Sequence, residues 1–395
     1  MSAAARVFER KPQPPAPLER LIDIWSRILN DTGVGPDSNF FDLGGDSLLA
    51  VGLFLEIEQE FGRSLPITTI YDAPTVAELA GLIEADAAPE FSPLVSLKEG
   101  DGSAPFFIVH GIGGTVIELS ALGRNIRIPG PVYALQARGL DGAQAPLETV
   151  DQMADLYVDA IRQTQPAGPY RLAGYSFGGL VAVEMARRLR ADRQEISLLV
   201  LIDAFAHPVT WPLPSRVRMQ CRRAFGRFRM ALTSPLDSCA SVLLRRAKAA
   251  AARARRFFSR AKQENSRPLR QWLLDRNPNL PLPLLKVREA GEAALSSYVP
   301  QFYPGRIMFL KAAGRDPEFP GDPQNIWRTL VHELEIRTVA GSHRTAVTEH
   351  AQSLADRLTE CISQSRRPRA IRAIPNMAGV WDAPGRRHLQ ADAGG

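Results

Sequence analysis

The sequence predicts two folded units: a small all-α bundle, followed by a larger α/β domain with a mostly parallel sheet and a helical insertion. Apolar residues recur at helical spacing between residues 17 and 86. From residue 105 onward, short apolar runs alternate with helical stretches, which is typical of a parallel sheet covered by helices. A Pro-bounded, Arg-rich stretch interrupts that alternation at 207–300, where we expect the insertion.

The composition indicates a protein that does not span a membrane. Hydrophobic residues make up 45% of the 395 residues, and no run offers the roughly 20 apolar residues that a spanning helix needs. The proline-rich lead 1–16 lacks the apolar core of a secretory signal, so we expect a cytoplasmic protein. We expect no metal site, because the three cysteines are far apart and form no metal-type spacing: Cys221, Cys239 and Cys361.

Charge is distributed very unevenly along the chain. Residues 17–86 contain 3 basic and 13 acidic residues, a net charge of −10. Residues 216–262 contain 14 basic residues and one acidic residue, a net charge of +13. We therefore expect electrostatic docking between the two segments, with Arg222, Arg223 and Arg227 as candidate contacts.

Residues 17–86 predict a bundle of helices. LERLIDIWSRILN carries its apolar residues at the i, i+3, i+4, i+7 spacing of an amphipathic helix. A second helix opens at Ser47 and ends at Gly62, since glycine commonly terminates helices. The last helix begins at Thr75, where Glu78 completes the Thr-x-x-Glu pattern of a capping box.

Two segments are expected to lack regular structure. Residues 87–104 are rich in Ala, Pro, Gly and acidic residues, which suits an exposed linker. Residues 366–395 form a basic tail without periodicity, which we expect to be disordered. The α/β domain then spans 105–365, with a lid at about 207–300.

The motif GYSFG, centred on Ser176, carries the clearest chemical signal. The apolar run PYRLA precedes it and the helical stretch GLVAVEMARRLR follows it, as in a nucleophile elbow. The flanking glycines allow a strained turn that holds the serine hydroxyl where it meets a substrate. Ser176 is therefore the candidate nucleophile.

A serine nucleophile needs a base, and His343 is the best placed of the six histidines. It lies in GSHRT, directly after the apolar run LEIRTVA, in a loop at the carboxyl end of an expected strand. It also completes the chain order serine, acid, histidine. Four other histidines lie in less suitable contexts: His207, His332, His350 and His388.

Two aspartates could orient that histidine. Asp203 ends the expected strand SLLVLID, and Asp316 follows the expected strand RIMFLKAAGR. Either carboxylate could also merely cap a turn. These residues alone leave both candidates open.

An oxyanion hole needs two N–H donors near the nucleophile. We expect the backbone N–H of Phe177 and that of Ile112, which lies in the glycine-rich run VHGIGG. The same run could be a phosphate loop, but it lacks the G-x-x-x-x-G-K-[ST] and G-x-G-x-x-G spacings. Nucleotide binding is therefore the weaker interpretation.

The runs VHGIGGTVIELSALG, YALQARGLDG and QPAGPYRLAGYSFGGLVAVEMARRL resemble the type I thioesterase domains that end nonribosomal peptide and polyketide assembly lines. The resemblance covers roughly residues 105–365. It implies an α/β-hydrolase fold with a variable helical lid, the histidine at His343 and the acid at Asp203. We therefore prefer Asp203 and keep Asp316 as the alternative acid.

The run NFFDLGGDSLLAV, with its flanks, resembles peptidyl-type carrier domains across residues 17–86. In that family the serine of GGDSL, here Ser47, receives 4′-phosphopantetheine from coenzyme A. A helix N-terminus suits the negative charge of a phosphodiester. Taken without the resemblance, Ser47 could be a simple helix N-cap.

Together these resemblances imply a carrier fused to a thioesterase, which releases an acyl or peptidyl group through a Ser176 ester, most directly by hydrolysis. Transfer or cyclisation to an amine or hydroxyl is one alternative, and a non-catalytic docking module is another. Because residues 1–16 are too short for an adenylation domain, we expect loading in trans. The expected partners are a phosphopantetheinyl transferase and loading enzymes; nucleic acid is the weakest interpretation of the basic segment.

Overall fold

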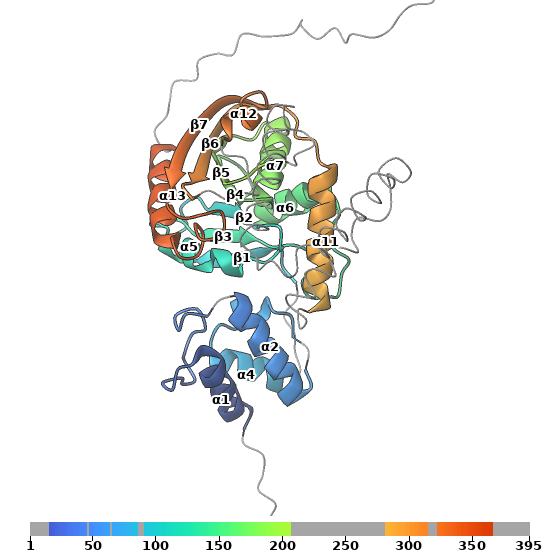
Figure 1. Ribbon diagram of the computed structural model, residues 1–395, viewed down its shortest axis with the longest axis vertical. Helices are drawn as coiled ribbons and strands as arrows, with labels where there is room; N and C mark the ends of the chain where they lie inside the picture. Colours follow the sequence, from blue (N-terminus) through green and yellow to red (C-terminus); the bar gives the residue numbers. More distant parts are fainter. Residues whose placement is uncertain are drawn as a thin grey trace, which may run out of the picture.

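The computed structural model shows a helical bundle and a seven-stranded α/β domain that pack against each other (Figure 1). It describes six stretches of the chain: residues 16–45, 47–63, 65–85, 91–206, 281–314 and 322–365. No helix within those stretches is long and apolar enough to cross a membrane. Asp316, the Arg-rich part of the insertion at 207–280 and the basic tail at 366–395 lie outside them.

The N-terminal bundle has the three helices that the sequence predicts and one short helix that it does not. Its elements are α1 (Pro17–Leu29), α2 (Ser47–Phe61), the short α3 (Thr69–Asp72) and α4 (Val76–Glu84). Thr75 and Glu78 form the predicted capping box at the start of α4. Gly62 ends α2 with a φ of +69°, a conformation that favours glycine. Trp25 packs edge-on against Phe40, with ring centroids 5.6 Å apart, at the centre of the bundle.

A single sheet organises the described residues from Leu94 onward. Its strands lie in the order β1-β3-β2-β4-β5-β6-β7, and all neighbouring pairs are parallel except β1 with β3. This is the predicted mostly parallel sheet. The strands are β1 (Leu94–Lys98), β2 (Phe106–Val109), β3 (Val132–Leu135), β4 (Tyr170–Tyr175), β5 (Ile196–Ile202), β6 (Tyr303–Ala312) and β7 (Val331–Val339).

Strand β1 corrects one expectation from the sequence. Residues 87–104 were expected to be an exposed linker, but Leu94–Lys98 within them pair with β3. Val95 and Leu97 are buried and Ser96 between them is exposed, because alternate residues of a strand face opposite sides of a sheet. The strand was not predicted because only the four residues from Val95 to Lys98 alternate in polarity, and Pro, Gly and acidic residues flank the strand.

Helices cover both faces of the sheet (Figure 1). α5 (Ser120–Asn125) and α13 (Ala351–Ser365) share one apolar cluster with Phe106 and Ile108 of β2. α6 (Val150–Thr164) and α7 (Gly178–Ala191) share the other with Phe107 and Val109 of the same strand. Both faces are thus buried, as a parallel sheet requires. The 3-10 helix η1 (Ile117–Leu119) and the short α12 (Gln324–Trp327) complete the connections.

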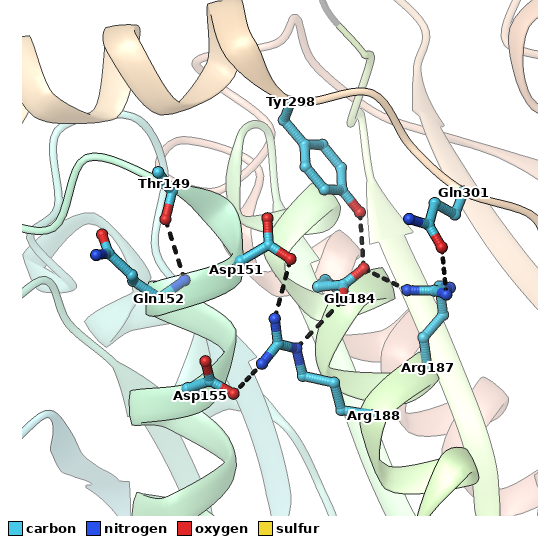
Figure 2. A network of polar contacts seen from close by, with 9 residues as sticks. All are labelled: Thr149, Asp151, Gln152, Asp155, Glu184, Arg187, Arg188, Tyr298 and Gln301. Carbon is cyan, nitrogen blue, oxygen red and sulfur yellow. Dashed lines mark hydrogen bonds and ion pairs between the residues drawn. The ribbon is translucent and has the colours of Figure 1, made fainter.

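The described end of the insertion is α11 (Leu282–Ser297), and a polar network fixes it to the domain (Figure 2). Tyr298, which follows α11, donates a 3.1 Å hydrogen bond to the buried carboxylate of Glu184 in α7. Glu184 also accepts from Arg187 and Arg188, and Arg188 pairs in turn with Asp151 and Asp155 of α6. A buried carboxylate needs such partners. The network therefore joins α6, α7 and α11.

Candidate active site

Adjacent parallel strands bring two of the predicted residues to one edge of the sheet. Ser176 directly follows β4, and its N–H donates to Ile202 O at 2.9 Å. Asp203 directly follows β5, and its N–H donates to Leu310 O at 2.8 Å. Both have positive φ, 53° for Ser176 and 47° for Asp203, which is uncommon outside glycine. Strained backbone of this kind clusters at functional sites.

The turn around Ser176 depends on the glycines of the motif. A Cβ on Gly174 would lie 2.2 Å from Gly178 O, and a Cβ on Gly178 would lie 2.1 Å from His110 O. A Cβ atom would clash at those distances, so only glycine lets β4, α7 and the loop after β2 approach one another this closely. The sequence pattern and the geometry agree at this turn.

His343 joins Ser176 to Asp203 by two hydrogen bonds. Its Nε2 lies 2.9 Å from Ser176 Oγ, and its Nδ1 lies 2.8 Å from Asp203 Oδ2. Because a carboxylate only accepts, Nδ1 carries the proton and Nε2 is left to accept from the serine hydroxyl. His343 and Asp203 are both buried, which strengthens these bonds by excluding water. The structure thus brings together the nucleophile, base and acid candidates preferred from the sequence.

Two further contacts hold the relay in place. Ala312 N–H donates to the second oxygen of Asp203 at 3.1 Å, so both oxygens of that carboxylate are occupied. Tyr175 stacks on the His343 ring, with centroids 5.4 Å apart, and its hydroxyl donates to His343 O at 2.8 Å. No local pattern indicates this role of Tyr175, because Tyr175 stands 168 residues from its partner.

The two expected oxyanion donors belong to different segments of the chain. Phe177 immediately precedes α7, and Ile112 lies in the loop after β2. Among the described residues, neither backbone N–H donates to a protein oxygen. α11 packs closely on the loop, since a Cβ on Gly291 would lie 3.0 Å from Ile112 O.

His110 supports the loop, although no pattern in the sequence indicates this role. Its Nδ1 donates to Gly111 O at 2.5 Å, and its Nε2 accepts from the Tyr157 hydroxyl at 2.7 Å. Burial lowers the pKa of His110 to about 4, so the ring is neutral as this pattern requires. Gly111 C=O and Ile112 N–H belong to one peptide group, so His110 also fixes the direction of that N–H.

Glu118 is a further ionisable residue beside this loop. Its Oε1 would lie 2.8 Å from a Cβ on Gly111, so the glycine leaves room for the carboxylate. Burial raises the pKa of Glu118 to about 7, and the positive charge of Arg288 in α11 opposes that shift. No motif in the sequence pointed to it.

The attachment serine predicted for the bundle lies at a helix start. Ser47 is the first residue of the 15-residue helix α2. The first turn of that helix carries no acidic residue. A phosphodiester there would meet the positive end of the helix dipole, so this position fits a phosphopantetheine group.

The order of the strands, the backbone of the elbow and the covering helices define the larger domain as an α/β-hydrolase fold. The family model described as a thioesterase domain matches residues 104–362. The family model described as a phosphopantetheine attachment site matches residues 19–83. The chain therefore belongs to the thioesterase domain family, and it carries a phosphopantetheine carrier domain ahead of the thioesterase domain.

Similar proteins are multidomain synthetases. A dimodular nonribosomal peptide synthase of Bacillus subtilis (strain 168) is 41% identical over 203 residues, which are 51% of this chain and 8% of that protein. An indigoidine synthase of Streptomyces lavendulae is 34% identical over 205 residues, which are 52% of this chain and 15% of that protein. This chain thus spans a small fraction of either relative.

A solved structure has the same fold over most of the chain. It is a four-domain nonribosomal peptide synthetase in its holo form, bound to AMP and glycine. The match has a TM-score of 0.52 and 24% sequence identity, and it covers 93% of this chain and 27% of that one.

Proposed function

We propose that this chain is a carrier–thioesterase pair that receives an acyl or peptidyl group at Ser47 and releases it by hydrolysis through an ester on Ser176. The observation that carries the proposal is the hydrogen-bonded relay from Ser176 through His343 to Asp203. The setting is nonribosomal peptide-type secondary metabolism in the cytoplasm. A phosphopantetheinyl transferase and acyl-loading enzymes are the proposed partners.

The relay supplies the proton transfers of thioester cleavage. His343 Nε2 takes the Ser176 hydroxyl proton while Oγ attacks the carbonyl carbon. His343 then gives that proton to the departing sulfur, the C–S bond breaks and an ester on Ser176 remains. Water repeats the sequence: His343 takes its proton, the C–O bond to Ser176 breaks and the proton returns to Oγ. The Nδ1 proton stays on His343 throughout, and Nδ1–H donates a hydrogen bond to Asp203.

We propose that two N–H groups stabilise the charge that develops on the carbonyl oxygen. Phe177 and Ile112 are the proposed donors, and His110 orients the second. When attached at Ser47, phosphopantetheine supplies the thiol that carries the acyl group as a thioester. The N-terminus of α2 holds its phosphodiester.

Intact mass spectrometry of the full chain tests the proposal. A phosphopantetheinyl transferase with coenzyme A should add one prosthetic group to the wild type and none to Ser47→Ala. After the holo chain is loaded with an acyl group, the released product should be the free acid. An amide, ester or ring in its place identifies transfer or cyclisation, and no release at all identifies a non-catalytic carrier.

A further inference from the structure

The carrier domain contacts the thioesterase domain through a small patch that comprises Phe41 and Tyr71 of the carrier and Ser120 and Arg124 of α5. Tyr71 of α3 places its hydroxyl 3.0 Å from Ser120 Oγ. Ser120 is buried, so its hydroxyl has its partner in the other domain. Tyr71 also stacks on Phe41 of the carrier, with centroids 5.2 Å apart and planes 27° from parallel.

Arg124, one turn further along α5, makes three contacts with Phe41 and Asp42 of the carrier. Its guanidinium lies 5.1 Å from the centroid of the Phe41 ring. It donates to Phe41 O at 3.4 Å and lies 3.6 Å from an Asp42 carboxylate oxygen. The Asp42 side chain is 72% exposed, so the ion pair alone contributes little, and the guanidinium acts mainly through its combined contacts.

An apolar cluster joins the carrier to the helix beside the candidate active site. The buried core of the carrier forms one cluster with five residues of the thioesterase domain: Ile117, Ala137, Leu140, Leu284 and Val287. The last two lie on α11, at i and i+3. Gly291, one turn beyond Val287 on the same helix face, packs on the Ile112 loop. One apolar cluster therefore extends from the core of the carrier to the helix that packs on the proposed oxyanion loop.

We propose that Ser120 and Arg124 of α5 form the surface by which this thioesterase domain recognises the carrier domain that delivers its acyl group. The occupant is a carrier that presents the Phe41–Tyr71 stack with Asp42 beside it, as the carrier of this chain does. The inference rests on the proposed function. It assigns recognition to α5, and it does not require the Arg-rich segment 216–262.

The test compares two charge reversals on the full holo chain. Arg124→Glu places a carboxylate against Asp42 and the face of Phe41, and should slow acyl transfer to Ser176 about tenfold. Arg127→Glu is the matched control, because Arg127 lies three residues away and pairs with Asp356 within the thioesterase domain. It should change transfer by less than about twofold.

Hydrogen exchange of the same variants gives a readout that does not depend on catalysis. Arg124→Glu should accelerate exchange at residues 39–43, 69–72 and 117–125 and leave residues 170–206 protected. Arg127→Glu should leave exchange unchanged in all of these segments. Adding Asp42→Arg to Arg124→Glu restores an opposite-charge pair and should recover part of both effects. Tyr71→Phe, which keeps the stack and removes the bond to Ser120, should give a smaller loss in the same segments.

The outcomes separate this inference from the proposed function. If Arg124→Glu matches Arg127→Glu in both exchange and transfer, recognition by α5 is wrong even though the wild type transfers its acyl group. If the wild type shows no transfer but the exchange differences appear, the docking surface stands and the proposed function fails.

Discussion

At the scale of single residues, Asp203 accepts two hydrogen bonds, one from His343 and one from Ala312 N–H. Asp203→Asn would place an amide NH₂ group or a neutral oxygen against Nδ1, and so disturb the tautomer that lets Nε2 accept from Ser176. We expect turnover to fall about 10⁴-fold with the fold retained, as measured by steady-state kinetics and circular dichroism. Asp316→Asn is the comparison, and it should be nearly silent. The reverse result would make Asp316 the acid.

Tyr157 affects the proposed oxyanion donor indirectly: it bonds to His110, which bonds to the peptide group that carries the Ile112 N–H. Tyr157→Phe deletes only the hydroxyl, so the imidazole is less firmly oriented. We expect kcat to fall roughly threefold to tenfold with KM unchanged, since about 1 kcal/mol of hydrogen bonding is lost. Tyr170→Phe is the matched control, because this buried tyrosine bonds to Gln165 O elsewhere in the domain. Equal effects of the two variants on kcat would contradict a role for Tyr157 in the site.

At the scale of elements, the glycines divide into those that packing requires and those that it does not. A Cβ on Gly178 at the start of α7 would lie 2.1 Å from His110 O, whereas a Cβ on Gly81 in α4 would contact nothing within 4 Å. Gly178→Ala should therefore destabilise the thioesterase domain by more than about 3 kcal/mol. Gly81→Ala should stabilise the carrier by up to about 1 kcal/mol, because alanine is the better helix former. Denaturant unfolding of both variants measures the contrast, and a mild effect of Gly178→Ala would refute the close approach.

Elements with a complete local signal were predictable from the sequence. The Thr75 capping box, the stop at Gly62 and the elbow around Ser176 each need only a few neighbouring residues, and all three have the expected backbone. Strand β1 was missed because its alternation is short and its pairing with β3 is not local.

The preferred Asp203 came from the family resemblance, since the residues alone left two candidates. The His110–Tyr157 and Tyr175–His343 contacts could not be read from the sequence at all. They join residues 47 and 168 positions apart, so their existence depends on the packing of the sheet and not on any local pattern. The docking contacts of α5 are non-local for the same reason.

At the scale of the whole molecule, buried ionisable groups make stability depend on pH. The pKa of His110 is about 4 in the folded protein and about 6.5 when exposed, so between these values the unfolded chain binds more protons. This group therefore lowers the free energy of unfolding as pH falls. Burial raises the pKa of Glu118 to about 7, so this group raises the free energy of unfolding as pH falls from 7 to 4.5.

A comparison of wild type with His110→Asn isolates the first effect. Asparagine can still donate to Gly111 O but does not titrate, while Glu118 is common to both proteins. Between pH 7 and pH 4.5 the wild type should lose about 2–3 kcal/mol more unfolding free energy than the variant, measured by denaturant titration at each pH. Parallel pH profiles would show that His110 is not held neutral by burial.

The central claim is that an acyl group passes from the carrier at Ser47 to an ester on Ser176. The most direct measurement is rapid-quench, peptide-mapped mass spectrometry of the full holo chain after a single loading. In the wild type the acyl mass should leave the Ser47 peptide, appear on the Ser176 peptide and then be lost, whereas Ser176→Ala should retain it on the Ser47 peptide. Release from Ser176→Ala at the wild-type rate, with no acyl mass ever on the Ser176 peptide of the wild type, would contradict the account.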